Sequence, residues 1–150
     1  MTYWTICPKI IQKPDVGGDV LFTIGICDDR LLCRRLLEAQ IHLYEEENDI
    51  LFNIYEFSNG EELLEEIERD GLVFDLIFLD NSMKKLTGLE TARLIRQSKS
   101  TSACDIVFVT SADNHDQFMQ VRPLQVVCKP CTQEGVKAIL EKVLAFHIGK

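Results

Sequence analysis

The sequence predicts an α/β fold built on a parallel sheet, and two features of the chain lead to this prediction. Short apolar runs alternate with segments whose apolar residues recur at helical spacing, and five such strand–helix pairs follow one another. The chain has 150 residues, of which 46% are hydrophobic, so it is long enough for one domain with its own core. We expect this domain over residues 21–148. Residues 1–20 should form a separate arm, because Pro8, Pro14 and Gly17–Gly18 interrupt any regular period.

The first half of the chain is expected to hold two strands and two helices. A strand over Leu21–Cys27 leads into a helix whose apolar stripe comprises Leu31, Leu32, Leu36, Leu37, Ile41 and Tyr44. The second strand covers Leu51–Glu56. Ser58 is then expected to cap the second helix in a capping box with Glu61, and that helix should end near Asp70–Gly71.

The second half of the chain continues the alternation. Its expected elements are, in order, a strand over Leu72–Leu79, a helix after Gly88, a strand over Ile106–Val109, a weak helix over Asp113–Gln120, a strand over Leu124–Cys128 and a helix over Thr132–Phe146. The last helix carries its apolar side chains on one face, namely Val136, Ile139, Leu140, Val143 and Leu144. Three further strands thus complete the predicted sheet.

Polar side chains follow four of the predicted strands, at the point where each strand ends. Asp28 and Asp29 follow the first strand and Asp80 follows the third. Thr110 and Lys129 end the fourth and fifth. Because the carboxyl ends of parallel strands meet at one edge of a sheet, these side chains should share one pocket. Three acids, a hydroxyl and an ammonium suit a divalent cation together with a phosphoryl group.

The chemistry of this pocket favours Mg²⁺, which prefers oxygen ligands and takes only one or two protein carboxylates. Without a cation or an ammonium, the facing carboxylates would repel and raise the pKa of at least one of them. Asp80 could then act as a nucleophile that forms an aspartyl-phosphate. Lys129 and Thr110 would contact other phosphoryl oxygens, so that charge and positioning drive the transfer.

Each acidic position also has a simpler interpretation. Asp28 and Asp29 could be no more than the N-cap of the following helix, since Asp is favoured there. Asp80 could be a polar stop where a strand enters a loop. The three histidines, His42, His115 and His147, are dispersed and offer no catalytic triad or metal cluster, and we expect them at the surface.

Composition narrows the classes of partner. A formal net charge of -8 argues against direct binding of nucleic acid, which requires a basic patch. No apolar stretch approaches the roughly 20 residues of a membrane-spanning helix. The start of the chain lacks the basic segment and apolar core of a secretory signal. We therefore expect a cytoplasmic protein with reduced cysteines and a protein partner.

From Leu21 to Phe146, the chain resembles the receiver domain of bacterial two-component response regulators. The matching positions are the acidic pair Asp28–Asp29, the phosphoacceptor position Asp80, the Ser/Thr position Thr110, the pair Lys129–Pro130, and Met83 and Gly88 at the family spacings. The resemblance implies a doubly wound five-stranded parallel sheet flanked by five helices, the flavodoxin-like receiver fold. It also implies a signalling switch, not a turnover enzyme, that receives a phosphoryl group from a histidine kinase on Asp80.

The resemblance further implies a Mg²⁺ site. Asp29 and Asp80 would contact the metal directly, Asp28 would act through water, and the backbone carbonyl of Ser82 would complete the protein ligands. The stretches Phe108–Ser111 and Val121–Leu124 resemble LytTR-type regulators, whose receivers precede a DNA-binding domain. We therefore expect control of transcription through an output domain that is not present in this chain. The expected partners are a histidine kinase and either an output domain or a second copy of the chain.

Two positions depart from the family pattern. Lys84 stands where the family usually has Pro, which removes a rigid φ constraint beside the site. Val126 stands where the family often has a Tyr or Phe that moves inward on phosphorylation, and a small β-branched side chain cannot sweep in this way. Activation is then expected to work through the fourth helix and its flanking loops.

Other classes of protein account for the residues less fully. Cys128 and Cys131 form a Cys-x-x-Cys between a strand and a helix, the context of a thiol redox protein, but this alternative gives the acids no role. Zinc would need further Cys or His ligands at standard spacing. A phosphatase of the aspartyl-phosphate type commonly has a second acid two positions after its nucleophile, where this chain has Ser82.

Overall fold

The computed structural model describes residues 22–98 and 101–148 of the chain. The predicted arm at residues 1–20 lies outside the described residues. Within the described part, no helix combines the length and apolar character needed to cross a membrane.

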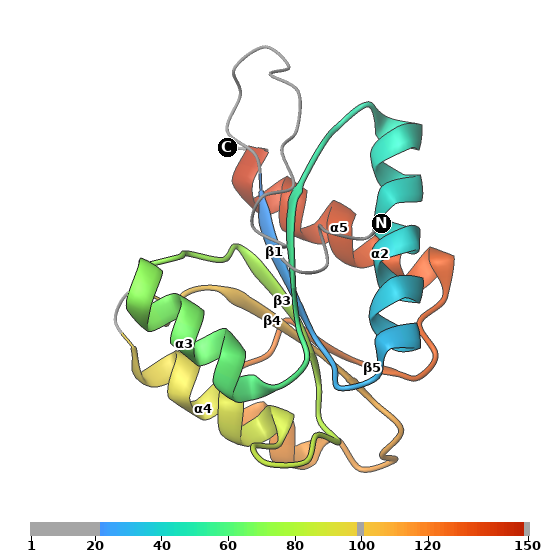
Figure 1. The fold of residues 1–150 in the computed structure, drawn as a ribbon. Helices are drawn as coiled ribbons and strands as arrows, with labels where there is room; N and C mark the ends of the chain where they lie inside the picture. The colour runs from blue at the N-terminus through green and yellow to red at the C-terminus, as the bar shows by residue number, and fades with distance from the viewer. Residues whose placement is uncertain (1–21, 99–100, 149–150) are drawn as a thin grey trace.

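Five parallel strands form one sheet in the order β2-β1-β3-β4-β5 (Figure 1). Their bounds are, in chain order, β1 Thr23–Cys27, β2 Asn53–Phe57, β3 Leu76–Asp80, β4 Asp105–Thr110 and β5 Gln125–Cys128. All four neighbouring pairs are parallel. The strand order reverses between β1 and β3, and open α/β sheets bind ligands at the carboxyl edge of such a switch point. The predicted doubly wound parallel sheet is confirmed.

Helices cover both faces of the sheet. Their bounds are α2 Leu31–Asn48, α3 Gly60–Asp70, α4 Gly88–Gln97, the 3₁₀ helix η2 Asp116–Val121, and α5 Gln133–Ile148. Figure 1 shows α2 and α5 on one face, and α3 and α4 on the other. The weak helix expected over Asp113–Gln120 is therefore a short 3₁₀ helix. It buries Phe118 and Val121, three residues apart as the 3₁₀ repeat requires, and it ends at Arg122, whose φ is 52°.

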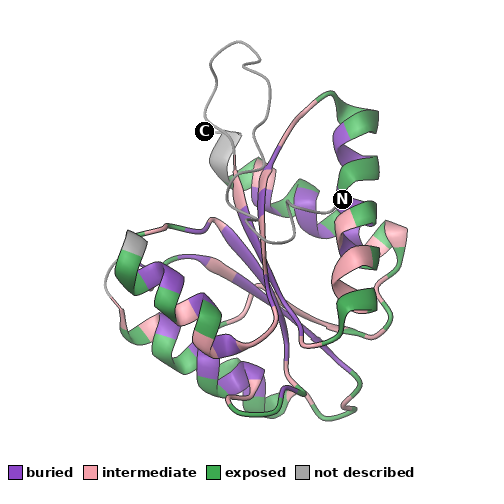
Figure 2. Ribbon diagram, viewed as in Figure 1, coloured by how far each residue is buried: buried purple, intermediate pink, exposed green. Residues whose placement is uncertain are grey.

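Alternate residues of the strands feed two separate hydrophobic cores, one on each face of the sheet. Ile26 and Phe78 pack in the core under α2 and α5, whereas Ile77 and Leu79 pack in the core under α3 and α4. This division follows from the two-residue side-chain period of a strand. β3 is buried along its whole length, as Figure 2 shows for the centre of the sheet.

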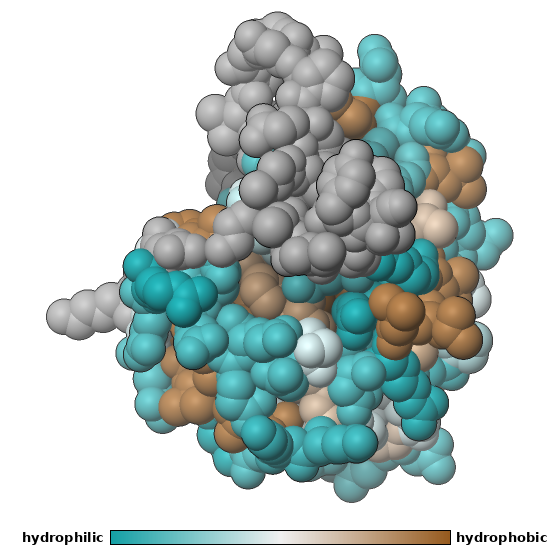
Figure 3. All heavy atoms as spheres, in the orientation of Figure 1, coloured by the Kyte–Doolittle hydropathy of each residue, from teal (hydrophilic) through white to brown (hydrophobic). Residues whose placement is uncertain are grey.

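The predicted apolar stripe of α2 is wrong at three positions. Leu31, Leu32 and Leu36 are exposed, with Leu32 82% accessible. The buried row runs through Leu37, Ile41 and Tyr44. At 3.6 residues per turn the three exposed leucines lie about 100° or more around the helix from Leu37, so they cannot face the same core. In Figure 3, hydrophobic side chains reach the surface on the side where α2 lies.

The predicted cap of α3 is displaced by one residue. Asn59, not Ser58, is the N-cap, and its side-chain oxygen accepts a hydrogen bond of 2.8 Å from the Glu62 backbone N–H. The Ser58 backbone N–H donates to the Glu62 carboxylate at 3.0 Å, so the predicted partner Glu61 is replaced as well. The helix does end at Asp70 as expected, because Gly71 adopts a left-handed conformation with φ 63°.

Candidate metal centre

Three aspartates converge at the carboxyl edge of the sheet. Asp28 follows β1 directly and is buried, Asp29 is half-buried, and Asp80 is the last residue of β3 and only 3% exposed. One carboxylate oxygen from each of the three lies within 4.8 Å of the others. The structure thus brings together side chains that are separated by about fifty residues in the chain.

Lys129 joins the cluster from the end of β5. Its Nζ lies 3.0 Å from Asp80 Oδ1 and 3.2 Å from Asp28 Oδ2. Burial acts to lower the pKa of Lys129, but the hydrogen bond and charge of Asp80, reinforced by Asp28, outweigh it and raise the pKa. Lys129 therefore remains a cation.

Opposing effects also act on the pKa of Asp80. Burial raises its pKa, the hydrogen bond from Lys129 opposes the increase, and the charge of Asp28 adds to it. The net result is a raised pKa, so the ionised carboxylate is under electrostatic strain that one ammonium does not remove. A divalent cation would remove this strain.

A metal ion would also compensate an Asp29 oxygen that receives no hydrogen bond from the described protein groups. Asp29 Oδ1 is buried and has no hydrogen-bond partner among the described residues. A buried carboxylate oxygen without a donor is costly unless a cation compensates it. The donor set consists of hard carboxylate oxygens, which suits Mg²⁺ better than a soft metal.

The acidic pair does not serve as a helix cap. The N-cap of α2 is Arg30, whose side chain makes no capping hydrogen bond. Asp28 Oδ1 instead accepts from the Arg30 backbone N–H at 2.9 Å, which closes the turn between strand and helix. The simpler interpretation of this pair as an N-cap is therefore not supported.

Thr110 lies at the same edge as the last residue of β4, and it is 1% exposed. It pairs with Cys128 in the sheet, and its backbone carbonyl accepts from the Lys129 N–H at 2.9 Å. Its hydroxyl accepts from the Ala112 N–H at 3.0 Å. These bonds fix Thr110 beside the lysine.

The loop after Asp80 is held by Asn81, a residue to which the sequence patterns gave no role. Its backbone carbonyl accepts from the N–H groups of Met83 and Gly88, and its side chain accepts from the Leu89 N–H at 3.0 Å. A Cβ at Gly88 would lie 2.5 Å from the Asp80 carbonyl oxygen, so only glycine fits there. The Asx side chain directly after the strand is the signal that could have identified this role.

A family comparison decides the class of protein. The model of the response regulator receiver domain matches residues 24–141, which cover most of the chain. The chain belongs to this family. Receiver domains of response regulators are phosphorylation-dependent signalling switches of two-component systems.

Curated relatives agree with the receiver assignment. Sensory transduction protein LytR of Staphylococcus epidermidis is 30% identical over 122 residues, which cover 79% of this chain and 44% of the relative. LytT of Oceanobacillus iheyensis is 27% identical, over 80% of this chain and 47% of the relative. The chain thus spans about half the length of these relatives, and both agree with the predicted LytTR type.

Solved structures share the fold of this chain. Chemotaxis protein CheY4 of Vibrio cholerae superposes with a TM-score of 0.72 at 19% identity, over 83% of this chain and all of that structure. The phosphorylated cyanobacterial phytochrome response regulator RcpA gives a TM-score of 0.68 at 16% identity, over 85% of this chain and 94% of that structure. At these identities the likeness establishes the fold alone.

The thiol redox alternative gains no support from this receiver domain. Cys128 is exposed and Cys131 half-buried, and both are free thiols. Burial raises the pKa of Cys131, whereas a redox-active thiol needs a lowered pKa. Among the described residues, the converging metal-ligating group is the aspartate trio, which contains no cysteine.

The two departures from the family pattern lie in different parts of the fold. Lys84 is exposed in the loop after Asp80. Val126 is half-buried in β5 and packs against the core that α3 and α4 cover. The position of the usual aromatic switch residue therefore holds a small side chain that is already packed.

Proposed function

We propose that this domain accepts a phosphoryl group from a histidine kinase on Asp80, with Mg²⁺ bound beside it. The observation that carries the proposal is the convergence of Asp28, Asp29 and Asp80, with Lys129 3.0 Å from the acceptor carboxylate. Asp29 and Asp80 would be direct ligands of the metal, Asp28 would act through water, and the Ser82 carbonyl would complete the set. When bound, Mg²⁺ would neutralise charge on the phosphoryl oxygens.

The chain's own groups supply the rest of the chemistry. An oxygen of Asp80 forms the bond to phosphorus as the P–N bond of the phosphohistidine breaks, so no further reactant is needed. Lys129 keeps the acceptor ionised before transfer and contacts a phosphoryl oxygen after it. Thr110 donates its hydroxyl hydrogen to another oxygen, while the hydroxyl oxygen can still accept from the Ala112 N–H, because a hydroxyl both donates and accepts.

The output of the switch runs through α4 and its flanking loops in this proposal. Arg96 of α4 donates to the carbonyls of Val121 at 2.8 Å, Arg122 at 3.0 Å and Ser102 at 2.8 Å. One guanidinium thereby ties α4 to the segment that follows Thr110 and to the loop before β4. A shift of Thr110 toward the phosphoryl group would be transmitted to α4 through this segment, without an aromatic side chain at Val126.

The biological setting follows from the same proposal. The domain over residues 21–148 acts as a signalling switch and not as a turnover enzyme, and residues 1–20 form a separate arm. The protein acts in the cytoplasm, and its partners are a histidine kinase and either an output domain that controls transcription or a second copy of the chain. The curated relatives, named as sensory transduction proteins and about twice as long, support this setting. The net charge of -8 argues against nucleic-acid binding by this segment.

Site mapping of the phosphoryl group tests the proposal. The full chain is treated with acetyl phosphate and Mg²⁺, then reduced with borohydride, which converts an aspartyl-phosphate into homoserine, and digested for peptide mass spectrometry. We expect homoserine at position 80 alone. The control variant Asp113→Asn removes an exposed acid at the same edge and should be labelled like the wild type. Homoserine at another aspartate, or none at all, would reject the assignment.

A further inference from the structure

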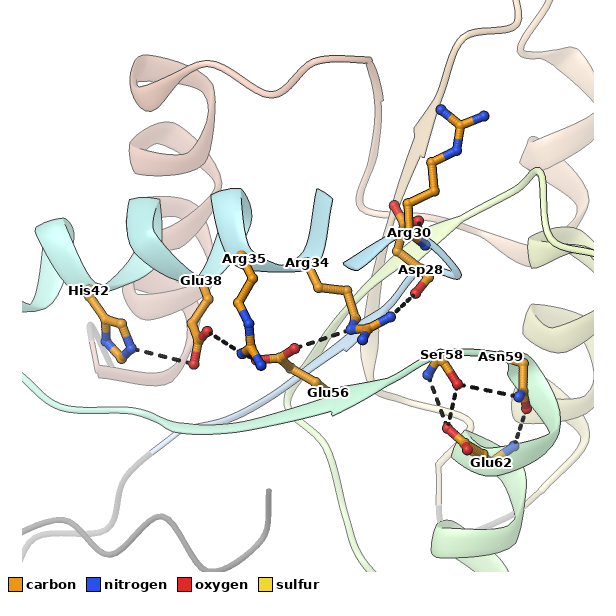
Figure 4. Close-up of polar contacts among 10 residues, drawn as sticks. All are labelled: Asp28, Arg30, Arg34, Arg35, Glu38, His42, Glu56, Ser58, Asn59 and Glu62. Carbon is orange, nitrogen blue, oxygen red and sulfur yellow. Dashed lines mark hydrogen bonds and ion pairs between the residues drawn. The ribbon is translucent and has the colours of Figure 1, made fainter. Parts of the chain in front are cut away.

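Arg34 lies in the first turns of α2 and contacts the turn that carries Asp28 and Asp29. Its Nη1 donates to the backbone carbonyl of Asp28 at 2.8 Å, and its Nε donates to Glu56 Oε1 at 3.1 Å (Figure 4). The Arg34 side chain is only 15% exposed. The guanidinium therefore bridges the turn that carries the acids and the β2 strand beside it.

The Asp28 carbonyl, which accepts the hydrogen bond from Arg34, lies outside the hydrogen-bonded strands of the sheet. β1 ends at Cys27, and the Asp28 N–H still bonds to the Phe57 carbonyl at 3.1 Å. The Asp28 carbonyl lies beyond the last paired residues of β1, and the residue is buried. A buried carbonyl without a donor would cost stability, so the turn depends on the Arg34 side chain to remain in this conformation.

We propose that Arg34 is a positioning residue of the metal site: by holding the Asp28 carbonyl, it fixes the Asp28–Asp29 turn so that both carboxylates face Asp80. This inference rests on the proposed function. The planar guanidinium suits the task, because its fork can bond Asp28 and Glu56 at once, whereas a lysine offers only a point charge. Groups that orient metal ligands in this way commonly change metal affinity by about 10–100-fold when they are lost.

Arg35 provides a matched control within the same helix. Its Nη1 donates to Glu56 Oε2 at 2.8 Å and to Glu38 Oε1 at 3.0 Å, and its side chain is 35% exposed. Among the described residues its hydrogen bonds go to these two carboxylates and not to the Asp28 turn. Loss of either arginine removes one positive charge and one ion pair with Glu56, but only loss of Arg34 releases the Asp28 carbonyl.

The direction of the change in cation affinity distinguishes a positioning role of Arg34 from a purely electrostatic one. Removing a positive charge near a cation site strengthens cation binding by simple electrostatics. Releasing the turn weakens binding, because the carboxylates of Asp28 and Asp29 no longer converge on Asp80. Charge and positioning therefore predict opposite changes for Arg34→Gln.

Titration of the full chain with Mn²⁺, followed by electron paramagnetic resonance, measures this difference, and Asp29→Asn identifies the binding that belongs to the trio. We expect Arg34→Gln to bind Mn²⁺ about tenfold or more weakly than the wild type. Arg35→Gln should bind at least as tightly as the wild type. Arg34→Lys should remain weak, since it keeps the charge but not the fork.

Three outcomes would overturn the inference: equal Mn²⁺ affinity for Arg34→Gln and Arg35→Gln, tighter binding by Arg34→Gln, or full recovery in Arg34→Lys. Thermal unfolding followed by circular dichroism verifies that each variant is folded during the titration.

Phosphorylation of the wild type by acetyl phosphate is measured in parallel, to distinguish failure of this inference from failure of the proposed function. A wild type that binds Mn²⁺ but takes no phosphoryl group would reject the proposed function and leave the test of Arg34 valid, and a wild type that binds no Mn²⁺ would reject both.

Discussion

At the scale of single residues, the site depends on an imbalance of charge that the sequence only partly reveals. The positions of Asp28, Asp29 and Asp80 after apolar runs were enough to predict their convergence. Asp29 Oδ1, which has no hydrogen-bond partner within residues 22–98 and 101–148, and the part played by Asn81 could not be predicted, because both depend on the path of loops that carry no periodic signal. The predicted carbonyl ligand Ser82 stays a prediction.

Replacement of Lys129 by methionine tests the charge balance around Asp80. The variant keeps an unbranched side chain but removes the hydrogen bond and the charge that oppose the rise of the Asp80 pKa. In the absence of divalent cations, the pKa of Asp80 should therefore be higher than in the wild type, and the carboxylate less ionised near neutral pH. Titration of the carboxyl carbon by ¹³C NMR measures this pKa. An unchanged or lower value would contradict the described balance.

His42 should make stability depend on pH in the alkaline range. Hydrogen bonds to Glu38 and Glu45 raise its pKa from 6.5 to about 9, against the opposing effect of burial. A group whose pKa is raised on folding stabilises the protein fully below its unfolded pKa, and this contribution is lost as the pH rises through the folded value. Because the side chain is 46% exposed, the contribution should stay below ~1 kcal/mol.

Urea unfolding of the wild type and His42→Gln over the pH range measures this contribution. The difference between the two free energies of unfolding should be largest below pH 6.5 and vanish above about pH 9. A difference that persists unchanged at higher pH would show that packing, and not charge, is responsible.

At the scale of elements, periodicity predicted the strands well and the helix faces less well. β4 lies within one residue at each end of its predicted range, because a short continuous apolar run that ends at a polar residue is typical of a strand buried on both faces. β3 was predicted to begin at Leu72, but it begins at Leu76, since the apolar residues at 72–74 belong to the preceding connection. Leucine occupies several sides of α2, so composition alone could not show which row faces the core. The cap of α3 was displaced because Ser58 and Asn59 are both good N-caps, and only the backbone distinguishes them.

Truncation of leucines in α2 tests the corrected face. Leu37→Ala removes a buried side chain and should lower the free energy of unfolding by ~2–5 kcal/mol. Leu32→Ala removes an exposed one and should change it by less than ~0.5 kcal/mol. Urea denaturation gives both values. A large loss in Leu32→Ala would mean that this surface is covered in solution.

At the scale of the whole molecule, the fold accounts for the placement of a switch at this edge. The sheet reverses its order between β1 and β3, so the loops after these strands diverge and leave a crevice at the carboxyl edge, where the acids meet. This arrangement was predictable from the sequence, because it depends on the order of strands and helices. The proposed output through α4 was expected from Val126 in the sequence and stays a proposal. The Arg96 bonds to the segment after Thr110 could not be predicted, because they depend on the path of that loop.

Intact-mass analysis after treatment with acetyl phosphate tests the central claim, that the converged aspartates hold a cation beside a nucleophilic Asp80. The wild type should gain one phosphoryl group with Mg²⁺ and none with excess EDTA, and Asp80→Asn should gain none in either condition. A phosphoryl group that Asp80→Asn retains, or one that the wild type acquires equally well in EDTA, would contradict the account.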